Sequence, residues 1–176
     1  MPYSHTRDFP ADILTRAASV RLACFDVDGT LTDGRLIFDS DGRELKAFHS
    51  RDGQGLALLR RAGIPIAFVT ARAGVIAERR AAELGAEVWT KVGDKLACVT
   101  AIALRMGIGM QAVGLAVAPA DAHAWVRERV HWRTVTGGGA GAARELCDLL
   151  LAAQGQEDVL LAQALQPEAI PKATLA

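Results

Sequence analysis

The chain has 176 residues, with 20 Lys and Arg against 20 Asp and Glu, so its formal net charge is zero. This length predicts one domain, because single domains usually run about 100–200 residues. Hydrophobic residues make up 51% and charged residues 23%, which excludes a disordered chain and leaves no positive excess to hold a phosphate backbone. We therefore expect a globular protein without a nucleic-acid partner.

Neither a membrane span nor a disulfide framework is expected. The longest uncharged stretch, 106–120, has fifteen residues and is broken by three glycines and a proline, whereas a bilayer span needs about 20. The three cysteines, at 24, 98 and 147, match no zinc spacing and leave one thiol unpaired in any disulfide scheme. We interpret them as reduced core thiols of a cytoplasmic protein.

Strand-like and helix-like segments alternate along the chain, which predicts an α/β fold with a mostly parallel sheet and helices on both faces. After a lead helix at 11–19, the expected strands are 21–27, 65–70, 87–90, 111–118 and 131–135. The expected helices are 54–61, 74–84, 94–106 and 120–129, followed by one that runs from a glycine loop at 137–141 to 153. Two short segments, 35–38 and 44–49, flank an Asp-Gly turn and predict a β-hairpin after the first strand. Residues 156–176 are expected to form a tail.

Two aspartates end the first strand. Residues 24–33 read CFDVDGTLTD, so Asp26 and Asp28 lie two apart where a buried apolar run stops. Alternation along a strand aims both carboxylates to one side of its tip, and two such carboxylates repel each other unless a cation or a shared proton relieves them. A hard cation such as Mg²⁺ prefers oxygen ligands, so the pair predicts a metal and phosphate site. A solvated Asp-rich turn is the alternative.

The string in its place after a buried strand resembles the first signature of the haloacid dehalogenase (HAD) superfamily of phosphohydrolases. The resemblance implies that Asp26 attacks phosphorus, that Asp28 acts as general acid and base, and that both contribute to a Mg²⁺ site. Thr70, at the end of the strand 65–70, and Lys95, in the segment 93–97, match the superfamily's phosphate-binding threonine and charge-neutralising lysine. Without the resemblance, Thr70 would be a helix cap and Lys95 a solvated side chain.

Further strings narrow the resemblance to the family of 3-deoxy-D-manno-octulosonate 8-phosphate (KDO 8-phosphate) phosphatases. They include FDVDGTLTDGRL at 25–36, DGRELKAFH at 41–49, and RELCDLLLAAQG at 144–155, and the match covers roughly 10–155. The resemblance implies a single HAD-like domain over 10–155 that hydrolyses a phosphorylated sugar acid in lipopolysaccharide core synthesis. It also implies that the hairpin arm, 35–49, replaces a mobile lid and joins four copies into a homotetramer.

The same resemblance suggests side chains that contact substrate. Arg72, two residues after Thr70, is similar to the family's substrate-contacting arginine, with a surface salt bridge as the alternative. Thr30 in the first loop is expected to contact substrate as well. His49 and Asp52 either face the sugar hydroxyls or cap the helix that begins near Gly53.

The chain departs from the family pattern after Lys95. The superfamily's fourth signature, an acidic Gly-Asp-Asp string, is missing, since no acidic residue lies between Lys95 and Asp121. We estimate that about 15–20 residues are absent, comparable to a short crossover unit, so the sheet must lose a strand or rewire. Three interpretations remain: a KDO 8-phosphate phosphatase, a catalytically impaired binding or assembly subunit, and a phosphatase for another phosphorylated acid or an aryl phosphate.

Overall fold

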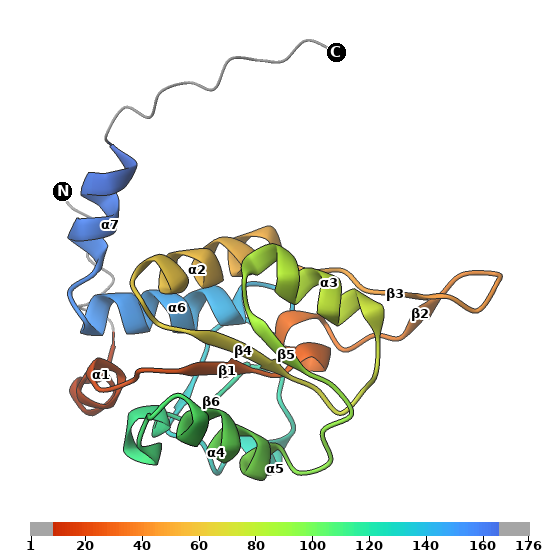
Figure 1. Ribbon diagram of the computed structural model, residues 1–176, viewed down its shortest axis with the longest axis horizontal. Helices are drawn as coiled ribbons and strands as arrows, with labels where there is room; N and C mark the ends of the chain where they lie inside the picture. Colours follow the sequence, from red (N-terminus) through yellow and green to blue (C-terminus); the bar gives the residue numbers. More distant parts are fainter. Residues whose placement is uncertain (1–8, 166–176) are drawn as a thin grey trace.

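A three-stranded parallel sheet forms the centre of the computed structural model, which describes residues 9–165 (Figure 1). The strands are β1 (Ala23–Phe25), β4 (Ile66–Val69) and β5 (Glu87–Trp89), and they lie in the order β1-β4-β5. All four residues of β4 are buried, as expected of a continuous apolar run in a parallel sheet covered on both faces.

Helices cover both faces of this sheet, which confirms the expected α/β architecture. On one face Phe25 and Phe68 join a core with Leu59 and Leu149, which lie on α2 (Ser50–Arg61) and α6 (Ala142–Ala153). The helices α1 (Ala11–Ala18) and α3 (Val75–Leu84) add to this core. On the other face Leu22, Ala67 and Val69 pack with α4 (Lys95–Arg105).

The hairpin lies where the sequence predicts it and projects away from the sheet (Figure 1). Its strands, β2 (Ile37–Phe38) and β3 (Glu44–Leu45), are antiparallel, with Ile37 opposite Leu45. The turn includes Gly42 at φ +76°, a left-handed conformation that favours glycine. Four large apolar side chains of the arm are exposed: Leu36, Ile37, Phe38 and Leu45.

The segment after α4 differs from the prediction of one strand over 111–118. Met110–Val113 forms a 3-10 helix, and only Val117–Ala118 is extended, as β6. This short strand pairs with β7 (Trp132–Arg133) in a separate two-stranded parallel sheet and not with β1. Too few residues separate α4 from β6 to build both a crossover and another strand of the main sheet. The helix expected over 120–129 is reduced to α5 (Ala124–Arg127).

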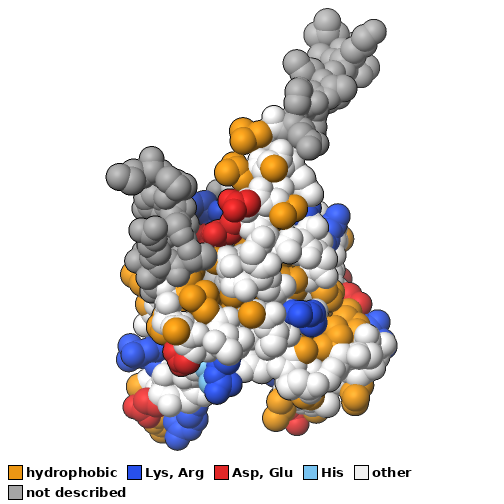
Figure 2. All heavy atoms as spheres, turned by 90° about the vertical axis from the view of Figure 1, so that its left-hand side faces the viewer, with side chains coloured by type: hydrophobic (Ala, Val, Ile, Leu, Met, Phe, Trp, Pro, Cys, Tyr) orange, Lys and Arg blue, Asp and Glu red, His pale blue; other side chains and the backbone are white. Residues whose placement is uncertain are grey.

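The C-terminal segment also differs from the expected tail, because Glu157–Ala164 forms the helix α7. Leu160 anchors this helix in the main core and is only 8% exposed. Apolar side chains remain on its outer surface, as Figure 2 shows from the side of α7: Val159, Leu161 and Leu165. The rest of the predicted tail, 166–176, lies outside the described residues. Within 9–165, no helix has the length and apolar character that crossing a bilayer requires.

Candidate active site

The loop after β1 holds the two aspartates at the carboxyl edge of the sheet. Asp26 directly follows β1, and its Oδ1 accepts a hydrogen bond from the Val27 N–H at 2.8 Å. A tight turn over Val27–Leu31 follows, in which Gly29 has φ +80°, a conformation that an L side chain rarely adopts. This turn fixes the backbone between Asp26 and Asp28.

Lys95 reaches Asp26 from the first turn of α4. Asp94 caps this helix by accepting a hydrogen bond from the Ala97 N–H at 3.0 Å. The cap places Lys95 so that its Nζ lies 2.5 Å from Asp26 Oδ2, with both side chains partly exposed. An ammonium group here neutralises a carboxylate and leaves room for a further anion.

Thr70 and Arg72 come from the loop after β4, the neighbouring strand. Thr70 is buried, its N–H donates to the Trp89 carbonyl, and its Oγ1 accepts a hydrogen bond from the Arg72 N–H at 3.2 Å. The Arg72 guanidinium extends over the site, with Nη2 2.9 Å from Glu44 Oε1 and Nε 4.0 Å from Asp28 Oδ2. The predicted arginine therefore lies beside the second aspartate.

The base of the hairpin arm contributes a cation that the sequence analysis missed. The Lys46 side chain is 4% exposed; its Nζ forms an ion pair with Asp28 Oδ1 and lies 3.1 Å from Glu44 Oε1. Burial acts to lower the pKa of Lys46, but hydrogen bonds to Asp28 and Glu44 outweigh it and raise this pKa. The spacing of Glu44 and Lys46 carried a signal, because alternate residues of an extended segment point to one side.

The other three expected substrate contacts, His49, Asp52 and Thr30, are held by different partners from those of the charged side chains Asp28, Glu44 and Lys46. His49 caps α2, since its Nδ1 accepts a hydrogen bond from the Arg51 N–H at 3.1 Å. Asp52 is buried, and its Oδ1 accepts a hydrogen bond from the Arg144 N–H at 2.8 Å where α6 begins. Burial raises the pKa of Asp52. Thr30 lines a cavity with Asp26.

The oxygen donors present fit a magnesium ion that keeps several waters. Asp26 carries a partly exposed carboxylate at the sheet edge, and Mg²⁺ is usually bound through one or two carboxylates together with substrate phosphate. Among residues 9–165, however, no group of three His, Cys, Asp or Glu side chains is arranged to hold a metal. Asp121 lies on the neighbouring loop, where its Oδ1 accepts a hydrogen bond from the Gly138 N–H at 2.9 Å.

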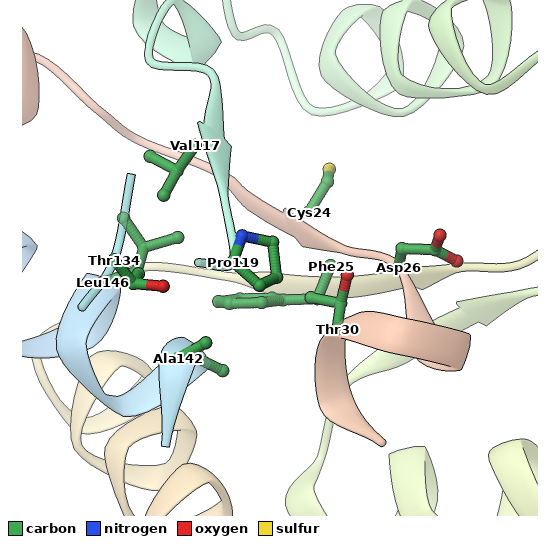
Figure 3. A pocket seen from close by; sticks show the side chains of 10 residues that line it. Cys24, Phe25, Asp26, Thr30, Val117, Pro119, Thr134, Ala142 and Leu146 are labelled. Carbon is green, nitrogen blue, oxygen red and sulfur yellow. The ribbon is translucent and has the colours of Figure 1, made fainter. Parts of the chain in front are cut away.

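A cavity of about 120 Å³ adjoins the first aspartate (Figure 3). Asp26 and Thr30 border one end, and Val117 and Pro119 of the β6 segment lie across from them. The remaining lining is mostly apolar. The site thus combines the Asp26 carboxylate paired with Lys95, the Asp28 carboxylate beside Lys46 and Arg72, and a mostly apolar cavity that borders Asp26.

Comparison with known proteins identifies the family. No protein-family model matches the chain. The 3-deoxy-D-manno-octulosonate 8-phosphate phosphatase KdsC of Escherichia coli strain K12 is 36% identical over 172 residues, covering 88% of this chain and 92% of that protein. The chain belongs to the KDO 8-phosphate phosphatase family. This places it among the phosphoric monoester hydrolases of the HAD superfamily, as the first-strand signature indicates.

Solved structures agree with this membership. A hypothetical protein from Xanthomonas campestris is 51% identical, with a TM-score of 0.90 over 93% of this chain and 98% of that one. The Moraxella catarrhalis KDO 8-phosphate phosphatase, in complex with magnesium, phosphate and KDO, is 31% identical, with a TM-score of 0.84 over 89% of this chain and 99% of that one. The magnesium ion in that relative agrees with the expected Mg²⁺ cofactor.

The alignment also measures what this chain lacks. It runs over 172 positions with the Escherichia coli relative, whereas 88% of 176 residues is about 155 residues. About 17 positions of the relative therefore have no counterpart here. This number is close to the 15–20 residues expected from the sequence.

Proposed function

We propose that the chain hydrolyses KDO 8-phosphate to the free sugar acid and inorganic phosphate, as a cytoplasmic step of lipopolysaccharide core sugar synthesis. The contact between Lys95 Nζ and Asp26 Oδ2 at the carboxyl edge of β1 carries the proposal. It joins the aspartate of the first-strand signature to the predicted charge-neutralising lysine. The identity of the substrate is inferred from the chain's relationship to KDO 8-phosphate phosphatases.

The chemistry follows from the two aspartates. A carboxylate oxygen of Asp26 attacks phosphorus, the bond between phosphorus and the sugar oxygen breaks, and an aspartyl-phosphate forms. Asp28 donates a proton to the departing sugar alkoxide. Asp28 then accepts a proton from water, whose oxygen attacks phosphorus, releases phosphate and regenerates the Asp26 carboxylate.

The surrounding groups hold the phosphoryl oxygens. Lys95 neutralises the nucleophile and the incoming dianion, and the Thr70 hydroxyl donates to a phosphoryl oxygen. The Asp26 carboxylate and the Asp28 backbone carbonyl would hold Mg²⁺, which when bound screens the repulsion between carboxylate and phosphate. With two protein ligands, we expect magnesium binding to depend strongly on phosphate being present.

The sugar acid is bound next to Asp28. The guanidinium of Arg72 suits bidentate binding of the substrate carboxylate or phosphate, and Glu44 now holds that guanidinium at 2.9 Å. Thr30, on the cavity beside Asp26, contacts the substrate in this arrangement. His49 and Asp52 act indirectly, through the start of α2 and its junction with α6.

The hairpin arm serves assembly. Leu36, Ile37, Phe38 and Leu45 expose 44–54% of their surface on this narrow projection. An apolar arm with open strand edges favours burial against other copies, so we propose a homotetramer joined by the arms. Sedimentation of the full chain beside Phe38→Glu tests it: the variant should sediment as a smaller species.

The relatives do not favour the two other functions that the sequence left open. These were an impaired binding or assembly subunit and a phosphatase for another phosphorylated acid or an aryl phosphate, whereas the curated relatives from Escherichia coli, Salmonella typhi and Yersinia pestis are KDO 8-phosphate phosphatases.

The nucleophile is tested by quenching the reaction in acid and reducing with borohydride, which converts an aspartyl-phosphate to homoserine. Peptide mass analysis should find homoserine at position 26 only after substrate addition. Homoserine at another aspartate would overturn the assignment.

A further inference from the structure

Four side chains of alternating charge form a ring at the base of the hairpin arm. Lys46 Nζ forms an ion pair with Asp28 and lies 3.1 Å from Glu44 Oε1. The same Glu44 oxygen accepts a hydrogen bond from Arg72 Nη2 at 2.9 Å. Arg72 Nε, at 4.0 Å from Asp28 Oδ2, closes the ring. Glu44 lies on β3, so the arm supplies the carboxylate that joins the two cations.

The Arg72 guanidinium uses only one of its edges in this ring. The planar group has a side edge, formed by Nε and Nη2, and an end edge, formed by Nη1 and Nη2. The side edge faces Glu44 and Asp28. Within residues 9–165, Nη1 takes part in no hydrogen bond or ion pair, and 42% of the side chain is exposed. The end edge can therefore bind an anion bidentately while Glu44 stays in place.

Glu44 keeps the guanidinium from closing onto Asp28. The backbone of Arg72 is held, because its N–H donates to Thr70 Oγ1 at 3.2 Å, but its long side chain can rotate. The 4.0 Å between Arg72 Nε and Asp28 Oδ2 is too long for a hydrogen bond. Without the Glu44 carboxylate, Asp28 would remain as the anion beside the guanidinium, and such pairs are frequently bidentate. Arg72 would then turn toward Asp28 and withdraw its end edge from a substrate.

Burial makes this hold on Arg72 firm. The Glu44 side chain is 17% exposed, and the Lys46 side chain, which contacts the same oxygen, is 4% exposed. A carboxylate that is mostly removed from water interacts more strongly with two adjacent cations than it would in water. Leu45 lies between them in the sequence, points to the other side of the extended segment and is exposed. The arm thus presents a charged side to the site and an apolar side away from it.

We propose that Glu44 is a positioning residue that makes the site selective for phosphate esters that carry a carboxylate. It holds Arg72 by the side edge, so that the end edge binds the carboxylate of the substrate. The phosphate has a different cation, Lys95, at 2.5 Å from Asp26, and Arg72 has no ion pair with Asp26 among the described residues. The inference rests on the proposed function, in which the substrate is a sugar acid.

The test compares KDO 8-phosphate, which carries a carboxylate, with p-nitrophenyl phosphate, which carries none. Glu44→Gln keeps the size of the side chain and removes its charge. The ratio of kcat/KM for the first substrate to that for the second should fall at least about tenfold, because hydrogen bonds between charged groups are the stronger ones. The loss should lie mainly in the KM for KDO 8-phosphate. Asp41→Asn is the matched control, since it removes the same charge at the exposed tip of the arm, where Asp41 pairs with Arg43 at 2.8 Å; the ratio should stay within about twofold.

A double-mutant cycle measures whether Glu44 acts through Arg72. In an Arg72→Met background, adding Glu44→Gln should change the ratio by less than about twofold. A larger change would show that Glu44 acts by another route and would overturn the inference.

Binding of free KDO, measured by calorimetry, gives a readout that needs no turnover. Its affinity should fall at least about tenfold in Glu44→Gln. A wild-type chain that binds KDO but releases no phosphate from KDO 8-phosphate would contradict the proposed function and leave this inference standing. A lower KM for KDO 8-phosphate in Glu44→Gln, equal losses on both substrates, or KDO affinity no weaker than that of the wild type would overturn the inference itself.

Discussion

Replacing Lys46 by Met tests whether the hairpin arm holds the second aspartate in place. The substitution keeps a long apolar side chain and removes the ammonium that pairs with Asp28 and Glu44. Removing one partner of a fully buried ion pair costs about 3–5 kcal/mol. Here the Asp28 and Glu44 side chains are still 21% and 17% exposed, and Arg72 stays close to both. We therefore expect a loss of about 1–2 kcal/mol.

Urea unfolding of the purified variant measures this loss. The midpoint should fall with an unchanged slope, because a change in midpoint alone reports stability. Lys91→Met is the matched control, since Lys91 is exposed and has no ion pair among the described residues; its effect should stay within about 0.5 kcal/mol. In Lys46→Met, kcat/KM should also fall about 10–100-fold, because Asp28 loses the ammonium group that holds it in place.

The pH dependence gives the sign of the Lys46 effect. The folded-state pKa of Lys46 lies above its ordinary value of 10.5, so the folded chain binds the proton more tightly than the unfolded chain. The contribution of protonated Lys46 to the stability of the fold is therefore fully present below pH 10.5 and is lost as pH rises through the folded-state pKa. The stability gap between wild type and Lys46→Met should be constant from about pH 7 to 9 and narrow above 10.5. Equal midpoints for the two proteins at pH 7 would refute the reasoning.

Three further changes probe the site and the core. Lys95→Met should lower kcat/KM by about 10²–10³-fold and change stability by less than about 1 kcal/mol, because this side chain is 43% exposed; unchanged phosphate release would contradict its role. Burial raises the pKa of Asp52 above 3.8, so the contribution of Asp52 to stability should fall as pH rises from 3.8 through the folded-state value. Asp52→Asn should abolish that fall and should be at least as stable as the wild type at pH 7 in urea unfolding. A variant less stable than the wild type at pH 7 would contradict this effect of burial on Asp52. Phe68→Ala, at a fully buried position, should cost about 3–5 kcal/mol in the same assay.

Local patterns in the sequence were sufficient to predict the loop after the first strand and the hairpin. A buried apolar run that stops at Asp26 defines a strand tip, and the Asp-Gly turn at 41–42 defines the hairpin. The structure bears out both elements. Order along the chain also brought Lys95 to Asp26, because successive βα units place their loops at one edge of a parallel sheet.

Contacts between distant elements were beyond such patterns. The spacing of Glu44 and Lys46 places both side chains on one side of the arm but does not indicate that the arm folds back onto Asp28. The sequence is equally compatible with Asp52 as a substrate ligand or as a helix cap. The apolar run 111–118 looks like a strand, yet Met110–Val113 forms a 3-10 helix and only Val117–Ala118 is extended, in a sheet apart from the main one. The helix α7 forms because Leu160 finds the core, which only the tertiary arrangement reveals.

The most direct measurement of the proposed activity is phosphate release from KDO 8-phosphate by the full chain, with Mg²⁺ or with EDTA, beside Asp26→Asn. Asparagine keeps the shape of the side chain and removes the nucleophilic carboxylate. We expect release that requires Mg²⁺ and is abolished in the variant. Release no faster than that of Asp26→Asn, from a chain whose circular dichroism shows it folded, would contradict the proposed activity.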